Sequence, residues 1–513
     1  MDGSYTDKYA AALSKLGTLP PDAPQGVIDI GSNSVRLVGY SGSARTPLPI
    51  YNERAFCRLG ESVSASGKIE GPQRDLAFDT FRRFRAIAEQ LGIQDIAAFA
   101  TAAVREASNG DAFIAEAEAL LGHKIRILTG EEEAVLSADG VMLGVLDADG
   151  IVADLGGGSL ELALVTDNEV HQWASLPLGV LALDEASQGD GAKMRALIET
   201  ALDRLDWLSE ARDRTIYIVG GTWRALAKMH MEKTSYPLEV LHQYKTSSYE
   251  IARFCRQISE GSLDLSMAAS NRRDALPAAA MVLEKLMQVV KPAHITVSAN
   301  AVREGVLYAE LKTKYRRLDP LLLACEEMAE RLCKSAAYGH ELAVWTDALY
   351  KHAAADMFSH AELNRLRQAG CLISDLAWAS HPSFRAEAVS RAVLTAPFVG
   401  ISHKGRVFLA RALSFRHEVK QGKPEYGPLT LSPQDDGLAQ AFGLALRLAH
   451  SLSASLPGAL PQSRLKAGRR KLTLTLSPEQ AMLNGPIIEK RLRAVAQAMQ
   501  LEPVLKSGKL DER

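Results

Sequence analysis

Two segments, 125 residues apart, repeat one pattern of residues that can bind phosphate. Each has an aspartate, an aliphatic residue, a glycine, two further residues and a serine, and a third glycine turn follows later. The residues of the three turns are Asp29, Gly31, Ser32, Asn33 and Ser34; Gly156, Gly157, Gly158 and Ser159; and Gly220, Gly221 and Thr222. Glycine permits positive φ and close approach, so backbone N–H groups in such turns can converge on phosphate oxygens. One turn alone would favour a plain hairpin, but three together predict phosphate binding.

The spacing of these turns excludes two common nucleotide sites. None of them matches the P-loop pattern GxxxxGK[ST] or the dinucleotide-binding pattern GxGxxG. The sequence therefore lends no support to a P-loop NTPase or to a nicotinamide-dependent dehydrogenase.

A pair of acidic residues flanks the second turn. Asp154 precedes its glycines, and Glu161 lies seven residues further along the chain. If the residues between them form a hairpin, both carboxylates lie at one end of it. There they could hold Mg²⁺, which prefers one or two carboxylates together with water and substrate phosphate oxygens. The alternative is a turn-stabilising aspartate and a glutamate at a strand edge, without a metal.

A second acidic site is the run of glutamates that follows Thr129. Acidic residues are favoured in the first turn of a helix by the macrodipole, and Thr129 with Glu132 fits a capping box. A structural role for Glu132 leaves Glu133 as the better candidate to deprotonate or orient a water near a phosphate. Arg105 could hold a phosphate bidentately, although the sequence alone favours a surface salt bridge for it.

The apolar pattern places these turns between the strands of α/β domains. Strand-like GVIDI and VRLVGY flank the first turn, and IVAD and LELALV flank the second. Such a repeated unit suggests two related α/β domains that face each other. The spacing also predicts a helix over Pro72–Leu91, helices from about Leu318, and a small mixed terminal unit with a strand at Lys471–Leu476 and a helix at Pro486–Met499.

The composition is that of a globular protein with an uneven charge. The chain has 513 residues, 47% of them hydrophobic and 23% charged, which excludes a disordered, collagen-like or coiled-coil chain. The net charge is −2, but from Leu318 onward 25 Lys and Arg stand against 19 Asp and Glu. That part carries +6 and the remainder −8, which hints at an anionic partner for the C-terminal part.

The cysteines and the N-terminus bear on the cellular compartment. The five cysteines are scattered without a CxxC pair, so we expect reduced thiols and no zinc site. The first residues lack the apolar region of a signal peptide, and no stretch of about 18 apolar residues could span a membrane. We expect a soluble cytoplasmic protein that binds neither membranes nor nucleic acid.

Seven motifs, in order, resemble those of the exopolyphosphatase / guanosine-pentaphosphate phosphohydrolase (Ppx/GppA) family. They are IDIGSNSVRLV, ATAAVREA, ILTGEEEA, ADLGGGSLELALV, LPLGV, IVGGTWRALA and ANAVREG, within residues 25–312. The resemblance implies the duplicated actin-like (ribonuclease H-like) α/β fold, which agrees with the repeat. It also implies an exopolyphosphatase that releases terminal orthophosphate from inorganic polyphosphate, with Mg²⁺ as cofactor and K⁺ as an additional ion.

The resemblance also assigns residues by motif. Glu133 matches the catalytic glutamate of the family, and Asp154 and Glu161 match its metal- and water-positioning carboxylates. The first two glycine turns match its phosphate loops. Arg105 matches an arginine that faces the phosphates, which reverses the interpretation from sequence alone. The third turn and Arg303 lie in matching motifs without a defined role.

The long form of the family adds a helical region related to HD metal phosphohydrolases. Residues 320–420 look similar, but Ile373-Ser374-Asp375 stands where His-Asp would be expected, so we expect no second metal site. The habit of the family implies a homodimer formed through the C-terminal domains. The expected segments are an N-terminal tail (1–24), actin-like domains (25–134 and 135–317), a mostly α-helical HD-like domain (318–425) and a small α/β domain (426–513).

A polyphosphate chain is a line of negative charges, so a processive enzyme needs a basic track away from the active site. The C-terminal surplus of positive charge supplies candidates: Lys404, Arg406, Arg411, Arg416, Arg469 and Arg470. For each one the alternative is a solvated helix face.

Three rival functions stay open. The first is a pppGpp 5′-phosphohydrolase, which uses the same chemistry on another substrate, alone or beside polyphosphate hydrolysis. The second is a nucleotide-binding regulator of the actin-like superfamily without useful hydrolysis, against which the intact Glu133, Asp154 and Glu161 set argues. The third, a sugar or acetate kinase on this fold, lacks a recognisable acceptor motif.

Overall fold

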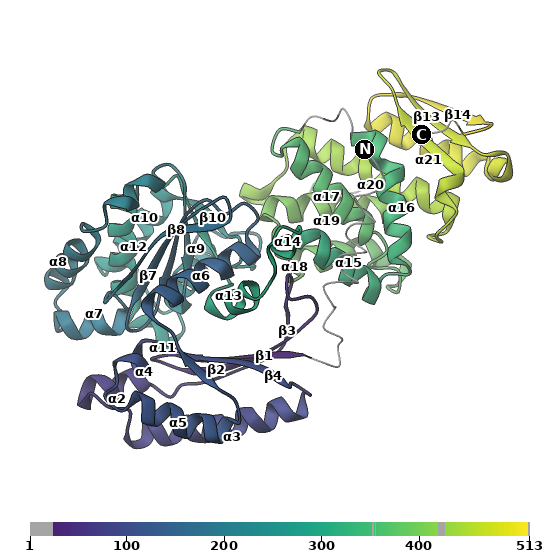
Figure 1. Cartoon of the computed structure of the whole chain (residues 1–513). Helices are drawn as coiled ribbons and strands as arrows, with labels where there is room; N and C mark the ends of the chain where they lie inside the picture. Colours follow the sequence, from purple (N-terminus) through teal and green to yellow (C-terminus); the bar gives the residue numbers. More distant parts are fainter. Residues whose placement is uncertain (1–23, 351–352, 354, 419–425, 511–513) are drawn as a thin grey trace. The chain divides into compact units, whose positions relative to one another are not determined.

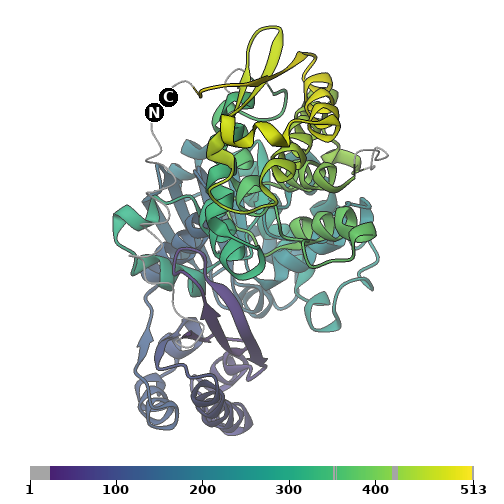
Figure 2. The same cartoon turned by 90° about the vertical axis from the view of Figure 1, so that its right-hand side faces the viewer.

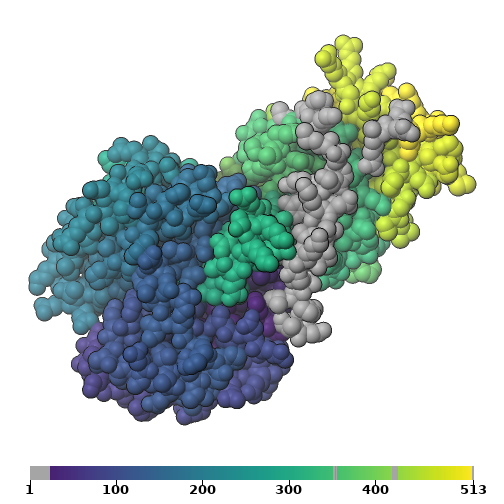
Figure 3. All heavy atoms as spheres, viewed as in Figure 1, coloured from purple at the N-terminus to yellow at the C-terminus, as the bar shows by residue number. Residues whose placement is uncertain are grey.

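The computed structural model describes residues 24–350, 353, 355–418 and 426–510, and these form two compact units. One unit comprises the described residues up to Leu318, without Tyr236–Leu238; the other comprises Asp319 onward together with Tyr236–Leu238. The first unit consists of two α/β halves, which appear as adjoining lobes in the space-filling view (Figure 3). The expected tail over residues 1–23 lies outside the described residues.

The first half is built on a five-stranded sheet with the order β3-β2-β1-β4-β5. Strands β1, β2 and β3 are antiparallel, and β4 and β5 run parallel to β1 (Figure 1). Helices α3 and α5 pack on one face through a cluster of buried apolar side chains that includes Phe81 and Phe113. The bounds are β1 Gln25–Ile30, β2 Val35–Ser41, β3 Leu48–Ala55, α2 Leu59–Ser66, α3 Gly71–Gln90, β4 Asp95–Ala100, α4 Ala102–Glu106, α5 Gly110–Leu121 and β5 Ile125–Ile127.

The second half repeats this topology. Its sheet has the order β10-β11-β9-β6-β7-β8, so β6, β7, β8, β9 and β11 take the places of β1 to β5, and β10 is an added strand. The strand directions also match, which confirms the duplication predicted from the repeated turn. The bounds are β6 Gly150–Leu155, β7 Leu160–Thr166, β8 Glu169–Leu176, α7 Val180–Ser187, α8 Gly191–Leu202, β9 Thr215–Val219, α9 Gly221–Lys233, β10 Lys245–Ser247, α10 Ser248–Ser259, α11 Ser270–Arg273, α12 Leu276–Val290 and β11 His294–Val297.

Two helices link the halves and cross at very short range. They are α6 (Gly130–Gly144) and α13 (Val302–Ala309). A Cβ atom on Gly140 would lie 2.0 Å from the carbonyl oxygen of Ala301, and one on Gly305 would lie 1.8 Å from that of Leu136. Only glycine allows this approach, so these two residues set the position of the N-terminal turns of both helices.

The second unit is mainly helical, with a three-stranded sheet near its end (Figure 2). Its principal elements are α15 Pro320–Leu332, α16 Ala336–Tyr350, α17 His360–Leu372, α18 Arg385–Thr395, α19 His403–His417, α20 Pro433–Ser453, β12 Ser463–Ala467, β13 Lys471–Leu476, α21 Pro486–Ala498 and β14 Glu502–Ser507. The predicted strand at Lys471–Leu476 and the helix from Pro486 are both present.

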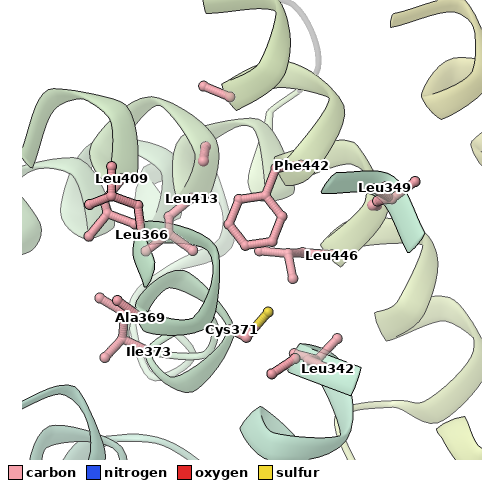
Figure 4. Close-up of a cluster of buried hydrophobic side chains, with 14 of the residues drawn as sticks. Leu342, Leu349, Leu366, Ala369, Cys371, Ile373, Leu409, Leu413, Phe442 and Leu446 are labelled. Atoms are coloured by element: carbon pink, nitrogen blue, oxygen red, sulfur yellow. The ribbon is translucent and has the colours of Figure 1, made fainter. Parts of the chain in front are cut away.

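One apolar core runs through this second unit. Side chains of α16, α17, α19 and α20 point toward one another around Phe442 (Figure 4). The same cluster continues into the terminal strands and helix through Leu474 and Leu492. The described residues of the two expected C-terminal domains, 318–425 and 426–513, therefore share a core, and the structure does not divide between them.

Among the described residues, we find no helix with both the length and the apolar character that crossing a bilayer requires.

Candidate active site

Asp154 and Glu161 lie opposite each other on the β6–β7 hairpin, as the sequence predicted. They form a register pair of the antiparallel strands, so their side chains lie on the same face. Ser137 of α6 donates a hydrogen bond to Asp154 Oδ2 at 2.8 Å, and Ser175 of β8 donates one to Glu161 Oε1 at 3.1 Å. The hairpin thus presents two carboxylates that are held by neutral hydroxyl groups.

Glu133 comes to this pair from the first turn of α6. The predicted capping box is present, since Thr129 Oγ1 accepts from Glu132 N–H at 3.2 Å and Glu132 Oε2 accepts from Thr129 N–H at 2.8 Å. Glu132 is thereby engaged at the helix end, and Glu133 is free of that role. Arg105 Nη1 donates to Glu133 Oε2 at 3.3 Å and to the Leu128 carbonyl at 2.7 Å. Arg105 therefore belongs to the site and does not form a separate surface salt bridge.

The three carboxyl groups share a buried environment that disfavours their charged forms. Burial raises the pKa of Glu133 to about 7, with Arg105 opposing the shift and Asp154 adding to it. Burial also raises the pKa of Asp154, and burial together with Glu133 raises the pKa of Glu161 well above its usual range. A cation beside them would relieve this repulsion, because it favours the ionised carboxylates.

The first and second glycine turns have the same conformation and lie against each other. Gly31 N–H donates to the Ser34 carbonyl at 3.1 Å, and Gly156 N–H donates to the Ser159 carbonyl at 3.0 Å. A Cβ atom on Gly157 would lie 3.5 Å from Ser32 Cβ. The two predicted phosphate loops, which are far apart in sequence, therefore meet at one place.

The third glycine turn adjoins the second. Gly220 has φ +103°, and a Cβ atom there would lie 2.4 Å from the Leu155 carbonyl and 3.3 Å from Asp154 Oδ1. Thr222 is buried in the first turn of α9, where its hydroxyl faces Arg272 at 3.5 Å. All three predicted turns are thus brought together around Asp154.

Arginines that the sequence interpretation did not assign gather at the same site. Arg303 Nη1 of α13 donates to Asp29 Oδ2 at 2.8 Å. Burial lowers the pKa of Arg36, and Arg303 and Arg54 add to the shift; burial lowers that of Arg224 to about 10, and Arg303 and Arg36 add to it. This mutual influence means that the guanidinium groups lie close to one another. The set is Arg36, Arg54, Arg224, Arg272 and Arg303.

Some of these arginines carried a signal in the sequence. Arg36, Arg224 and Arg303 lie inside the quoted motifs, close to the glycine turns or to the start of a helix. Arg54 and Arg272 lie outside every quoted motif, and only the folded chain brings them to the site. Arg54 enters from β3, and Arg272 lies over Gly221, with Nη2 2.7 Å from the position of a Cβ atom there.

The donor set of the site fits Mg²⁺. In the described part of the chain, no three His, Cys, Asp or Glu side chains gather closely enough to hold a metal by themselves. An ion here would depend on Asp154 and Glu161 together with water and substrate oxygens, which is the coordination that Mg²⁺ favours. The repulsion among the buried carboxyl groups points the same way.

The predicted polyphosphate track is only partly at the surface. Arg406, Arg411 and Arg416 are buried, with 1%, 5% and 5% of their surface exposed. Their partners are the carbonyl groups at the end of α18 for Arg406, Asp436 for Arg411 and Asp375 for Arg416. A track needs exposed cations, so the prediction does not hold for these three. Lys404, Arg469 and Arg470 are exposed and remain predicted track residues.

Asp375, near the position where a histidine–aspartate pair was sought, is 4% exposed. It accepts hydrogen bonds from Arg416 and, at 3.2 Å, from Ser455. A guanidinium is thus the cation beside this carboxylate.

Comparison with known proteins identifies the family. The model of the Ppx/GppA phosphatase family matches residues 35–314, and that of the exopolyphosphatase C-terminal domain matches residues 321–502. Exopolyphosphatase 1 of Mycobacterium leprae is 29% identical over 314 residues, which cover 56% of this chain and 90% of the relative. A guanosine-5′-triphosphate,3′-diphosphate pyrophosphatase of Aeromonas salmonicida is 25% identical over 511 residues, which cover 94% of this chain and 97% of the relative.

A solved structure agrees with this result. The crystal structure of an exopolyphosphatase from Cytophaga hutchinsonii has a TM-score of 0.51 and 25% identity, and the match covers 56% of this chain and 97% of the other. The matched family model covers more than half of the chain and includes the glycine turns from Val35 onward, Glu133, Asp154 and Glu161. The chain therefore belongs to the Ppx/GppA phosphatase family.

Proposed function

We propose that the protein is an exopolyphosphatase that releases terminal orthophosphate from inorganic polyphosphate by attack of water. The observation that carries the proposal is the position of Glu133, which lies beside Asp154 and Glu161 at the meeting point of the glycine turns. Such a site combines a base, acidic metal ligands and backbone groups suited to phosphate oxygens.

Glu133 acts as the general base. A water oxygen attacks the terminal phosphorus in line, the bond from that phosphorus to the bridging oxygen breaks, and the water proton passes to the Glu133 carboxylate. The shortened chain leaves with its bridging oxygen as a new terminal oxygen. A pKa of about 7 suits this task, because a base works best when its pKa is near the operating pH.

The rest of the site holds the anionic substrate. The N–H groups of the glycine turns and Arg105 neutralise charge on the transferring oxygens, and the unassigned arginines hold the phosphates that follow. Asp154 and Glu161 would hold Mg²⁺, which supplies charge neutralisation at the phosphoryl oxygens. Phosphoryl transfer needs little covalent help, so positioning and electrostatics account for the rate.

Replacing the base tests the proposal. Glu133→Gln should lose most turnover and keep substrate binding, because a base typically contributes about 10²–10⁴-fold to the rate. Glu131→Gln is a matched control, since Glu131 lies in the same helical turn and is exposed. Phosphate release is measured from long-chain polyphosphate, short-chain polyphosphate, pppGpp and ATP, each with and without Mg²⁺ and K⁺. Turnover near the wild-type rate in Glu133→Gln would refute the assignment.

Hydrolysis of pppGpp is the second candidate function. It is favoured by the extent of similarity, since the guanosine-5′-triphosphate,3′-diphosphate pyrophosphatase matches over 94% of the chain, including the C-terminal unit, and the M. leprae exopolyphosphatase over 56%. The same phosphate-release assay decides between them through kcat/KM for each substrate. A pppGpp value above that of every polyphosphate would make pppGpp the principal substrate.

We further propose a cytoplasmic homodimer that associates through the C-terminal unit and binds neither membrane nor nucleic acid. The proposal is supported by the resemblance stated above and by the scattered, unpaired cysteines. Light scattering on the full chain measures the oligomeric state, and a monomer at micromolar concentration would contradict this part of the proposal.

A further inference from the structure

The two repeats of the first unit differ in charge at one register position. In the second repeat, Asp154 is paired across the hairpin with Glu161. In the first repeat, Asp29 is paired in the same way with Arg36. Both partners lie seven residues after the aspartate, so the duplicated scaffold places a carboxylate in one half where it places a guanidinium in the other.

Asp29 is also engaged by a second arginine. Arg303 is 9% exposed and donates to Asp29 Oδ2 at 2.8 Å. Burial alone would lower the pKa of Arg303, but Glu304 and Asp29 outweigh burial and raise it. The guanidinium is therefore held firmly in its charged form beside Asp29.

Other arginines extend this positive region. Arg54 and Arg224 lie close enough to Arg303 for its charge to lower the pKa of each further, after burial has lowered it. A divalent cation brought to Asp29 would meet these charges in a partly buried setting, where screening by water is weak.

The second repeat has the opposite character. The neighbours of Asp154 and Glu161 are the hydroxyl groups of Ser137 and Ser175 and a further carboxyl, Glu133. A cation is stabilised there and repelled at Asp29.

We infer that each active site binds a single divalent cation, on Asp154 and Glu161 of the second repeat, and that Arg303 is the built-in cation of the first repeat. The inference rests on the proposed function, because it presumes a metal-dependent phosphatase site. The first glycine turn then contacts phosphate oxygens through its N–H groups and the nearby arginines, without a metal between them.

Manganese binding to the full-length protein tests this inference without any turnover. Mn²⁺ replaces Mg²⁺ at oxygen sites, and electron paramagnetic resonance counts the free ion during a titration. The titration is run with and without inorganic phosphate. Wild-type protein should bind one Mn²⁺ per chain.

Substitutions then locate the ion. Asp154→Asn and Glu161→Gln should each weaken Mn²⁺ binding by about tenfold or more, since even residues that only orient metal ligands contribute 10–100-fold. Asp29→Asn should leave the Kd for Mn²⁺ within about twofold of the wild-type value, as should the exposed control Asp79→Asn. Arg303→Met should weaken inhibition by inorganic phosphate and leave the number of bound Mn²⁺ ions at one.

The outcomes separate the inference from the proposed function. Two Mn²⁺ ions bound by the wild-type chain would overturn the inference and leave the proposed function standing, and so would a tenfold loss of Mn²⁺ affinity in a folded Asp29→Asn variant. No bound Mn²⁺, with or without phosphate, would overturn both. The wild-type stoichiometry decides the matter even if a variant fails to fold.

Discussion

Removal of Arg105 should shift the pH dependence of catalysis in a predictable direction. Arg105 Nη1 lies 3.3 Å from Glu133 Oε2, and the two side chains are only 27% and 12% exposed. An opposite charge this close lowers the pKa of a carboxyl group by about 1–3 units. Arg105→Gln removes the charge and keeps a hydrogen-bond donor for the neighbouring carbonyl. The pKa of Glu133 should therefore rise from about 7 by that amount.

The sign of the kinetic effect follows from the role of the base. Glu133 must be deprotonated to accept the water proton, so a higher pKa moves the acid limb of the kcat/KM profile to higher pH. At pH 7 the ionised fraction falls from about one half to about one tenth for the smallest shift in this range, a loss of about fivefold. This part of the loss should be recovered at higher pH, whereas any loss of phosphate contacts persists at every pH.

The assay is phosphate release from short-chain polyphosphate between pH 5 and 10 at a fixed Mg²⁺ concentration, with kcat/KM measured at each pH. Arg126→Gln is the matched control, since Arg126 pairs with the neighbouring Glu132 and should leave the midpoint unchanged. An Arg105→Gln midpoint that stays in place or moves to lower pH would refute the electrostatic argument.

Three further predictions concern the framework and the C-terminal unit. Gly305→Ala should lower the free energy of unfolding by about 3 kcal/mol or more, because its methyl group meets a backbone carbonyl; Gly437→Ala, where no atom lies within 4 Å, is the control in urea unfolding, and equal stability of the two would contradict the prediction. Arg406→Ala should lower the melting temperature and Lys404→Ala should not, since only Arg406 is buried on carbonyl groups; a normal melting temperature for Arg406→Ala would show those bonds to be dispensable. Deleting the chain after Leu318 should weaken hydrolysis of long polyphosphate more than that of short polyphosphate, and an equal loss at every chain length would count against a track.

Local features were predictable from the sequence alone. A glycine turn between two apolar strands, a capping box and a proline in the first turn of a helix depend on residues a few positions apart. The duplicated topology, the Asp154–Glu161 pair and the capping role of Glu132 followed from such features, and the structure has all three. The repeat could be read because it preserves one short pattern in both halves.

Charge and burial could not be predicted in this way. Arg406, Arg411 and Arg416 looked like surface cations because a sequence does not reveal which carbonyl or carboxylate a side chain will meet. Arg54 and Arg272 lie outside the motifs and reach the site only because separate segments fold around it.

The sequence by itself determined the repeated strand–turn–strand units, the phosphate-binding character of their loops and the family, because these depend on residue type and short spacing. Only the tertiary structure decided that the two repeats carry opposite charge, since it brings Arg303 to Asp29 across 274 positions of the chain and Glu133 to Glu161. The same burial raises the pKa of Glu133 to about 7, because desolvation depends on the packing of the whole unit.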